Sequence, residues 1–358
     1  MLRLEPRAAT PWWLAVASPL MAVVATMVAG GVLFALMGFD PVASIRTIFW
    51  DPLFGPASGY SRPQLLVKAG PLILIASGLA IGFRAGIWNI GAEGQYIIGG
   101  ICGAAVALAA YPAEGAWIFP AMVLAGAAGG WAWGMIPATL RNWTGASEIL
   151  VSLMLVYVAQ RVAAWMAFGP MRSPEGFGMP GSRNLQHYPS AANPELFAGT
   201  GAHWGVVAAA LAVLAPWFLM SRHIRGFRIR VAGLAPRAAR FAGVRPETLV
   251  AFCLGLSGAL AGMAGLFEVS GPGGQITDSF GSGYGFTAII VAFLGRLHPL
   301  GILLAGLLLA LTYIGGELAQ LMLQLPAATV QVFQGMLLFF LLGFDTLTRY
   351  RLRWRAAK

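Results

Sequence analysis

The sequence has few charged residues and little cysteine. Only 10% of its 358 residues are charged, 58% are hydrophobic, and the mean hydropathy is +0.74. Soluble domains carry about 25% charged residues, so this scarcity excludes an ordinary soluble fold. Cys102 and Cys253 both fall in apolar stretches, where a thiol packs as a small apolar group, and we expect no disulfide. The composition predicts an integral membrane protein.

The sequence also lacks the motifs of nucleotide binding and catalysis. It contains no P-loop, no H-E-x-x-H pair and no nucleophile elbow. Its four histidines show no metal-ligand spacing, so we expect no metal site. A membrane-embedded enzyme would need such a constellation, and we therefore expect a chain that is not an enzyme, has no catalytic residue and binds no cofactor itself.

Long apolar stretches recur along the whole chain. Crossing a hydrocarbon core takes about 20 apolar residues in a helix, and most of these stretches reach that length. We therefore predict an all-α integral membrane fold, a polytopic bundle of about ten transmembrane helices in a single transmembrane domain over residues 1–358. The predicted spans are 12–37, 64–82, 93–111, 116–140, 147–169, 204–221, 247–270, 286–297, 299–323 and 326–344.

The basic residues predict the orientation of these spans. The net charge of +10 fits membrane orientation and lipid contact better than nucleic-acid binding. Positive charges concentrate on the cytoplasmic side of membrane proteins, and here they favour an even number of crossings with both termini cytoplasmic. The predicted cytoplasmic parts are residues 1–11, 222–246 and 345–358, and the predicted periplasmic loop is 170–203.

Two regions are too rich in glycine and polar residues to be continuous lipid-facing helices. One is residues 82–100, and the other is residues 270–286, which precede a span too short to cross unaided. Irregular backbone at membrane depth is tolerated only against protein or a water-filled cavity. Interrupted helices, one in each half of a transporter, indicate two pseudo-repeated halves around a central pathway.

Polar and aromatic side chains near these regions are candidates for the substrate pathway. Buried charge is costly in a bilayer, so the acids should face the bundle interior. The alternative is that the polar groups cap broken helices, and that the aromatic groups, Tyr96 and Tyr284 among them, simply pack. The candidate pathway residues are Trp88, Asn89, Glu93, Gln95, Glu148, Ser152, Asp278 and Phe286.

An arginine-rich segment separates two long apolar stretches near the middle of the chain. Residues 222–245 hold seven arginines and no acid. Within the segment, Pro236 suits a first helical turn and Gly243 a helix stop, which predicts a short helix. The segment is interpreted either as a docking surface or as a positive loop that binds anionic lipid.

Spacing of glycines predicts where helices approach closely. The G-x-x-x-G pattern brings backbones together in membranes. The pairs that follow this pattern are Gly99 with Gly103, Gly126 with Gly130 and Gly134, and Gly258 with Gly262.

Several separate strings resemble membrane permeases of bacterial ABC importers. They run in order from about residue 60 to the carboxyl tail. More specifically, they resemble the nucleoside and simple-sugar branch of the branched-chain amino acid and ribose-type permeases. The strings are GFRAGIWNIGAEGQYIIGG, GASEILVSLMLVYVA, RVAGLAPRAARFAGV, SGALAGMAGLFEV and GYGFTAIIVAFLGRLHPLGILLAG.

The resemblance implies a fold like that of type II ABC importers, in the bacterial cytoplasmic (inner) membrane. It implies four kinds of partner: a second permease subunit, identical or homologous, a cytoplasmic ABC ATPase that carries ATP and Mg, an extracytoplasmic substrate-binding protein or lipoprotein, and membrane lipid. Nucleic acid is not among them. The residues that match the family's ATPase-coupling helix are Gly233, Leu234, Pro236, Arg237, Ala239, Arg240, Phe241 and Gly243.

The substrate class stays open between alternatives. The string NIGAEGQ favours nucleosides, with ribose- or galactose-type sugars as the closest competitor. An ion-driven secondary transporter would also have broken helices and buried acids. It would need neither the coupling helix nor an ATPase.

Overall fold

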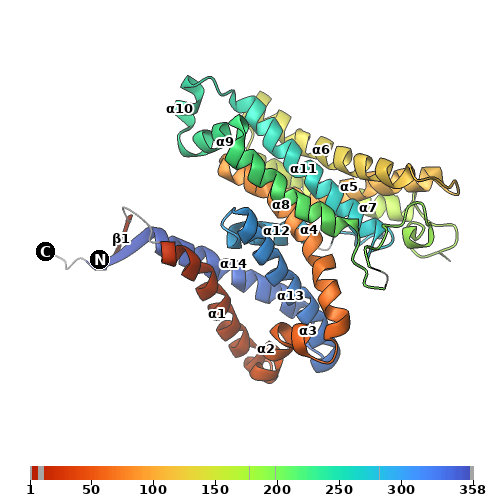
Figure 1. Cartoon of the computed structure of the whole chain (residues 1–358), viewed down its shortest axis with the longest axis horizontal. Coiled ribbons are helices and arrows are strands. Elements are labelled where there is room, and N and C mark those ends of the chain that lie inside the picture. The colour runs from red at the N-terminus through yellow and green to blue at the C-terminus, as the bar shows by residue number, and fades with distance from the viewer. Residues whose placement is uncertain (1, 7–11, 177, 198, 282, 355–358) are drawn as a thin grey trace. The chain divides into compact units, whose positions relative to one another are not determined.

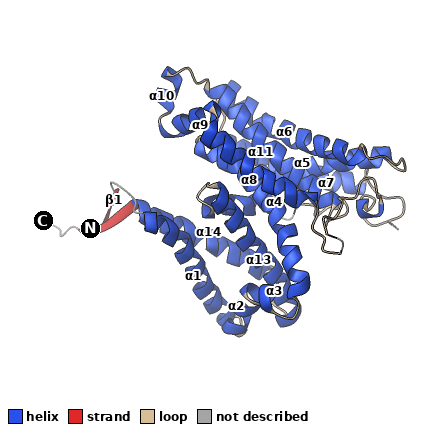
Figure 2. Cartoon of the chain, viewed as in Figure 1, coloured by secondary structure: helices blue, strands red, loops and turns tan. Residues whose placement is uncertain are grey.

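The computed structural model describes residues 2–6, 12–176, 178–197, 199–281 and 283–354, and helices dominate it (Figure 2). Of the predicted cytoplasmic ends, residues 1, 7–11 and 355–358 lie outside this part. The long helices are α1 (Trp12–Leu36), α4 (Ser58–Arg84), α5 (Ala92–Ala110), α6 (Ile118–Thr144), α7 (Glu148–Phe168), α8 (Trp204–Arg222), α11 (Pro246–Ser270), α13 (Pro299–Leu323) and α14 (Ala328–Arg349). The shorter elements are β1 (Leu2–Pro6), α2 (Pro41–Phe49), α3 (Asp51–Phe54), η1 (Leu185–His187), α9 (Ile224–Leu234), α10 (Pro236–Phe241), α12 (Tyr284–Leu294) and β2 (Tyr350–Trp354).

Each of the ten predicted spans coincides with a helix. Among the described residues, nine helices are long and apolar enough to cross a membrane. The tenth, α12, has only 11 residues, so the prediction that this span is too short to cross alone is confirmed. The polytopic helical bundle is confirmed as well.

A short strand pair joins the two ends of the chain, which the sequence did not predict. β1 pairs with β2 in antiparallel register, from Leu2 opposite Trp354 to Pro6 opposite Tyr350. The two described ends of the chain therefore lie side by side.

The chain forms two compact units. One comprises residues 1–62 and 311–358, and the other residues 63–310. In the first unit, α1 packs on α14: a Cβ atom at Gly30 would lie 2.6 Å from the Phe333 ring. Asp40 caps α2 through its side chain, which accepts N–H bonds from Val42 and Ala43, and α2 adds Ile48 to this core.

The second unit is built on close contact of α5, α6 and α11. A Cβ atom at Gly99 would lie 2.1 Å from the Cα atom of Gly262, and one at Gly130 would lie 2.1 Å from the carbonyl oxygen of Gly258. No side chain fits at these points, and the predicted glycine contacts are confirmed.

Two stretches interrupt the helices of the second unit. The first covers residues 85–91, between α4 and α5, and the second residues 271–283, between α11 and α12. The first is narrower than the predicted region 82–100, because α5 already begins at Ala92 and carries Glu93 and Gln95 in its first turn. Helix is possible there because protein surrounds these side chains, and lipid does not.

Candidate functional site

Three polar side chains from separate segments form a buried cluster, which we call the Asn89 cluster. Asn89 Nδ2 donates to Gln95 Oε1 at 2.7 Å and to Ser257 Oγ at 3.0 Å, and Gln95 Nε2 donates back to Asn89 Oδ1 at 3.3 Å. None of the three is more than 2% exposed. The cluster ties the first interruption to α5 and α11, and each amide satisfies part of the other's hydrogen-bonding capacity.

Glu93 joins the two interruptions. Its Oε1 accepts the N–H of Gly283 at 2.9 Å and its Oε2 accepts the N–H of Gly285 at 2.6 Å. Two donors on two oxygens fit an ionised carboxylate, because a protonated oxygen would turn its own O–H toward an N–H. The carboxyl group lies at the N-terminus of α12, where the helix dipole favours a negative charge. Glu93 therefore holds the start of α12 against the start of α5.

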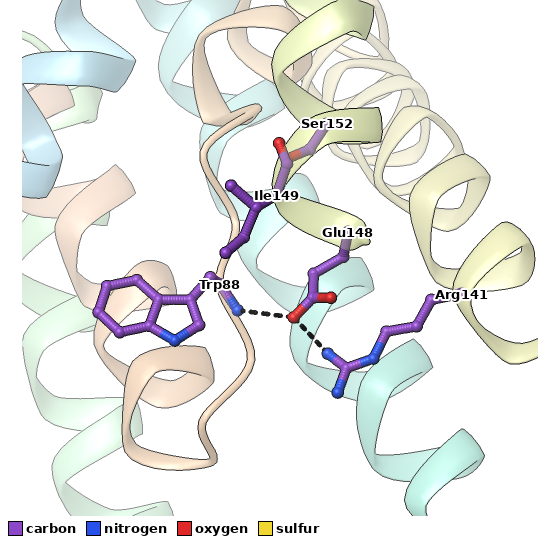
Figure 3. Close-up of polar contacts among 5 residues, drawn as sticks. All are labelled: Trp88, Arg141, Glu148, Ile149 and Ser152. Atoms are coloured by element: carbon purple, nitrogen blue, oxygen red, sulfur yellow. Dashed lines mark hydrogen bonds and ion pairs between the residues drawn. The ribbon is translucent and has the colours of Figure 1, made fainter. Parts of the chain in front are cut away.

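Glu148 holds the first interruption from the other side (Figure 3). Its Oε1 accepts the backbone N–H of Trp88 at 3.4 Å and pairs with the guanidinium of Arg141. Arg141 lies near the end of α6 and Glu148 in the first turn of α7. The α6–α7 connection is thereby fixed to the chain just before Asn89.

An aromatic stack adjoins this contact. The ring of Trp88 lies 4.9 Å from Phe83 and 5.7 Å from Phe293, and the Phe83 and Phe293 rings are stacked at 5.2 Å. Trp88 is 37% exposed. The stack joins the end of α4 to the end of α12, and Trp88 stays partly exposed.

The remaining pathway candidates fall into two groups. Ser152 is buried and donates to the Ile149 carbonyl, and α7 at this point lies against the Gly91 backbone. Asp278 and Phe286 are exposed, the first in the loop before α12 and the second on α12 itself.

Tyr96 and Tyr284 are buried, and Tyr96 stacks on Phe280 with ring centroids 5.4 Å apart. This arrangement favours the packing alternative for these two rings.

The predicted short helix in the arginine-rich segment is α10. It begins at Pro236, and Gly243 after it has a φ of +78°, which favours glycine. Leu234 is 87% and Phe241 94% exposed, while Ala239 is buried. Arg237 and Arg240 are exposed. α9 and α10 extend beyond the ends of α8 and α11 (Figure 1). Leu234 at the end of α9 and Phe241 at the end of α10 are exposed apolar side chains in an arginine-rich segment.

The arginine-rich segment packs against the end of α4, directly before the first interruption. A Cβ atom at Gly233 would lie 2.0 Å from the carbonyl oxygen of Arg84, so the backbones of α9 and of the end of α4 are in contact. Below α10, a cavity of about 200 Å³ is lined by residues of both, including Ala85, Gly86, Gly233 and Arg240. The lining of this cavity thus brings α10 next to the start of the first interruption.

The loop between α7 and α8 packs on the second interruption through His203. The His203 Nδ1 atom lies 2.9 Å from Asn193 Nδ2 and accepts the N–H of Gly205 at 3.1 Å. Asn193 N–H donates to the Ser270 carbonyl. Burial lowers the pKa of His203 from 6.5 to about 4, against a smaller opposite effect of the Glu195 charge. The neutral ring therefore holds this loop in place.

Sequence reasoning missed Arg141, Ser257 and His203 as parts of these contacts. Ser257 is 168 residues from Asn89 along the chain, and no local pattern relates the two. Arg141 stands seven residues before Glu148, across the connection between two spans.

Comparison with known proteins places this geometry in a transport family. Residues 62–342 match the family described as the permease component of the branched-chain amino acid transport system. The chain is 35% identical to the glucose ABC transporter permease protein of Haloferax volcanii, over 98% of this chain and 93% of that one.

Two further relatives are each 27% identical over 90% of this chain. One is the guanosine ABC transporter permease protein of Bacillus subtilis, covered over 91% of its length, and the other the nucleoside ABC transporter permease protein of Lactococcus lactis subsp. cremoris, covered over 89%. No solved structure matches the chain significantly. The family match covers most of the chain, the relatives are transport subunits, and the helices are those of a multi-pass membrane protein. The chain belongs to the permease family of the branched-chain amino acid transport system.

Proposed function

We propose that this chain is the permease subunit of an ATP-driven importer of nucleosides in the bacterial inner membrane. It forms one transmembrane permease domain over residues 1–358, with cytoplasmic termini. A separate ATPase binds ATP and Mg, a second and distinct permease subunit completes the pathway, and an extracytoplasmic protein delivers the substrate to the loop of residues 170–203. The names of the guanosine and nucleoside relatives support the substrate class.

The observation that carries this proposal is the exposed apolar surface at the ends of α9 and α10 on a rigid base. Leu234 and Phe241 are almost fully exposed apolar side chains. Exposed apolar surface of this kind is typical of a site that a partner covers. The base is rigid because Gly233 is in backbone contact with Arg84. An ATPase that grips α10 therefore moves the first interruption. The coupling residues are Gly233, Leu234, Pro236, Arg237, Ala239, Arg240, Phe241 and Gly243.

The pathway residues divide by exposure under this proposal. Trp88 and Phe286 are partly exposed aromatic residues that could stack on a nucleobase, and Asp278 lies exposed near the start of α12. The buried groups, Asn89, Glu93, Gln95, Glu148 and Ser152, shape the pathway by holding its broken helices.

A sugar importer is the second candidate. The glucose relative is 35% identical to this chain, against 27% for the two nucleoside relatives. Nucleosides and sugars share ring hydroxyl groups, so a pathway lined by polar groups suits both. Aromatic faces at Trp88 and Phe286 favour the flat base of a nucleoside.

Uptake in cells with and without the gene tests the proposal. Radiolabelled nucleosides, glucose and pentoses are offered while the proton gradient is collapsed and ATP is maintained. We expect gene-dependent nucleoside uptake that survives the uncoupler. Gene-dependent uptake of glucose alone would establish the sugar alternative, and uptake that disappears with the gradient would establish an ion-driven transporter.

A further inference from the structure

A cavity of about 360 Å³ lies between α9 and the first turns of α11, and Gly243 and Val244, in the turn after α10, also line it. We call it the arginine cavity. Among the described residues that line it, three are arginines and none is acidic. Those that matter here are Arg225, Arg228, Arg245, Thr248, Leu249 and Phe252.

The charges of the arginine cavity lack a counter-charge from its own lining. Arg225 and Arg228 stand one helical turn apart on α9, and Arg245 immediately precedes α11. All three are exposed. Glu247 is the nearest acid along the chain, but it is exposed and does not line the cavity. Three like charges around one hollow repel each other, and an anion inside it relieves this repulsion.

The floor of the arginine cavity is apolar. Leu249 and Phe252 are partly buried, and the Arg225 guanidinium lies 5.3 Å above the centre of the Phe252 ring. Both apolar residues belong to the first two turns of α11, a helix long enough to span the membrane. α8 ends its own span at Arg222, just before α9. The cavity therefore opens where two spans reach the membrane boundary.

We propose that the arginine cavity binds an anionic phospholipid, with its phosphate between the three arginines and an acyl chain along Leu249 and Phe252. Guanidinium groups bind phosphate oxygens in paired hydrogen bonds, and basic pockets between membrane helices recognise lipid head groups. The apolar floor decides between occupants. A free phosphate or an acidic protein side chain has no apolar part to place against Leu249 and Phe252, whereas the acyl chain of a lipid covers both.

The position of this site gives the lipid an effect on coupling. Val244 and Leu249 line the arginine cavity and also the cavity below α10. A lipid bound in the arginine cavity therefore contacts residues that also line the cavity below α10. It stabilises the packing of α9 and α10 on α11. The inference rests only on membrane insertion of the chain, so it stands or falls independently of the transported substrate.

Lipid retention by the purified full-length chain tests the proposal. The protein is delipidated in neutral detergent and titrated with phosphatidylglycerol or phosphatidylcholine, and bound lipid is counted by native mass spectrometry. We expect one phosphatidylglycerol bound in preference to phosphatidylcholine. The double change Arg228→Gln and Arg245→Gln should weaken it about tenfold or more, since each basic group near a membrane surface contributes to anionic lipid binding.

Arg222→Gln is the matched control, because it removes a nearby positive charge that does not line the cavity. It should change phosphatidylglycerol binding less than twofold. Phe252→Ala should also weaken binding, which a purely electrostatic surface would not show. Gel filtration of each variant checks its folding, and Arg245→Lys provides a milder second variant that keeps the charge.

Three results would overturn the inference. Equal retention of phosphatidylglycerol by the double variant and the control would show that these arginines hold no lipid. Displacement of the lipid by millimolar inorganic phosphate would make this a site for free phosphate. Displacement by the purified ATPase would make it part of a protein interface.

Discussion

Glu93→Gln separates a structural role of this carboxylate from a role in binding substrate. The carboxylate accepts N–H bonds from Gly283 and Gly285 through its two oxygens. Glutamine keeps one oxygen and places an amide NH₂ group against the other N–H donor. The shape of the side chain is nearly unchanged, so the effect reports on hydrogen bonding and charge.

The expected loss of stability follows from these contacts. A hydrogen bond to a charged acceptor contributes about 1.5–3 kcal/mol, and the attraction of a negative charge to a helix N-terminus adds about 0.3–1 kcal/mol. Burying a neutral amide costs less than burying a carboxylate, which offsets part of this loss. The net destabilisation is about 2 kcal/mol, or roughly 4 °C in melting temperature for a unit of this size.

The assay combines melting of the purified protein with import kinetics of the reconstituted transporter. Glu93→Gln should lower the melting temperature and reduce the maximal import rate for every substrate alike. Asp278→Asn is the matched control, since it makes the same chemical change on an exposed residue, and it should melt like the wild type. An unchanged melting temperature with a raised KM for one substrate would refute the structural role and make Glu93 a substrate ligand.

Three further changes test other parts of the structure. Glu148→Gln removes the ion pair between the buried Glu148 carboxylate and the partly exposed Arg141 guanidinium and should cost about 1 kcal/mol at low salt; the difference from wild type should shrink in 1 M salt, and a loss independent of salt would contradict the ion pair. Gly130→Val forces a side chain into the Gly258 backbone and should cost about 3 kcal/mol or more, whereas Gly343→Val, with no atom within 4 Å, should fold normally; equal yields of folded protein would contradict the helix contact. Neutral His203 contributes stability that is fully present above pH 6.5 and is lost as the pH falls toward 4, about 3 kcal/mol in all. His203→Asn keeps an acceptor and should lose this acid sensitivity in melting experiments, and a variant as acid-sensitive as the wild type would refute this assignment.

The long helices were predictable because hydrophobic length is a local property. α13 begins and ends at the predicted residues, and the other spans differ by a few residues. The short helix α10 was also predictable, because Pro236 and Gly243 mark its limits within nine residues. Helix α9 was not predictable from the sequence. Its apolar residues and glycines alternate with arginines, so no apolar face marks the two buried positions, Gly226 and Ile229.

The contacts of the site were only half predictable. Burial of Glu93 followed from the cost of charge in a membrane, but its partners at Gly283 and Gly285 lie 190 and 192 residues away. Distant partners also explain why the first interruption, residues 85–91, is shorter than the predicted region 82–100. A sequence shows that Glu93 and Gln95 are polar, but only the fold shows that Ser257 and the start of α12 satisfy them within a regular helix.

Cross-linking of α10 to the ATPase tests the central proposal most directly. Phe241→Cys is introduced into a chain in which Cys102 and Cys253 are replaced by alanine, and the transporter is assembled with a single exposed cysteine placed on its ATPase. Phe197→Cys, on the exposed loop between α7 and α8, is the control. We predict a cross-link from position 241 that changes in yield with ATP and none from position 197. A cross-link from position 197, or none from 241 in an assembly that hydrolyses ATP, would contradict the coupling role of α10.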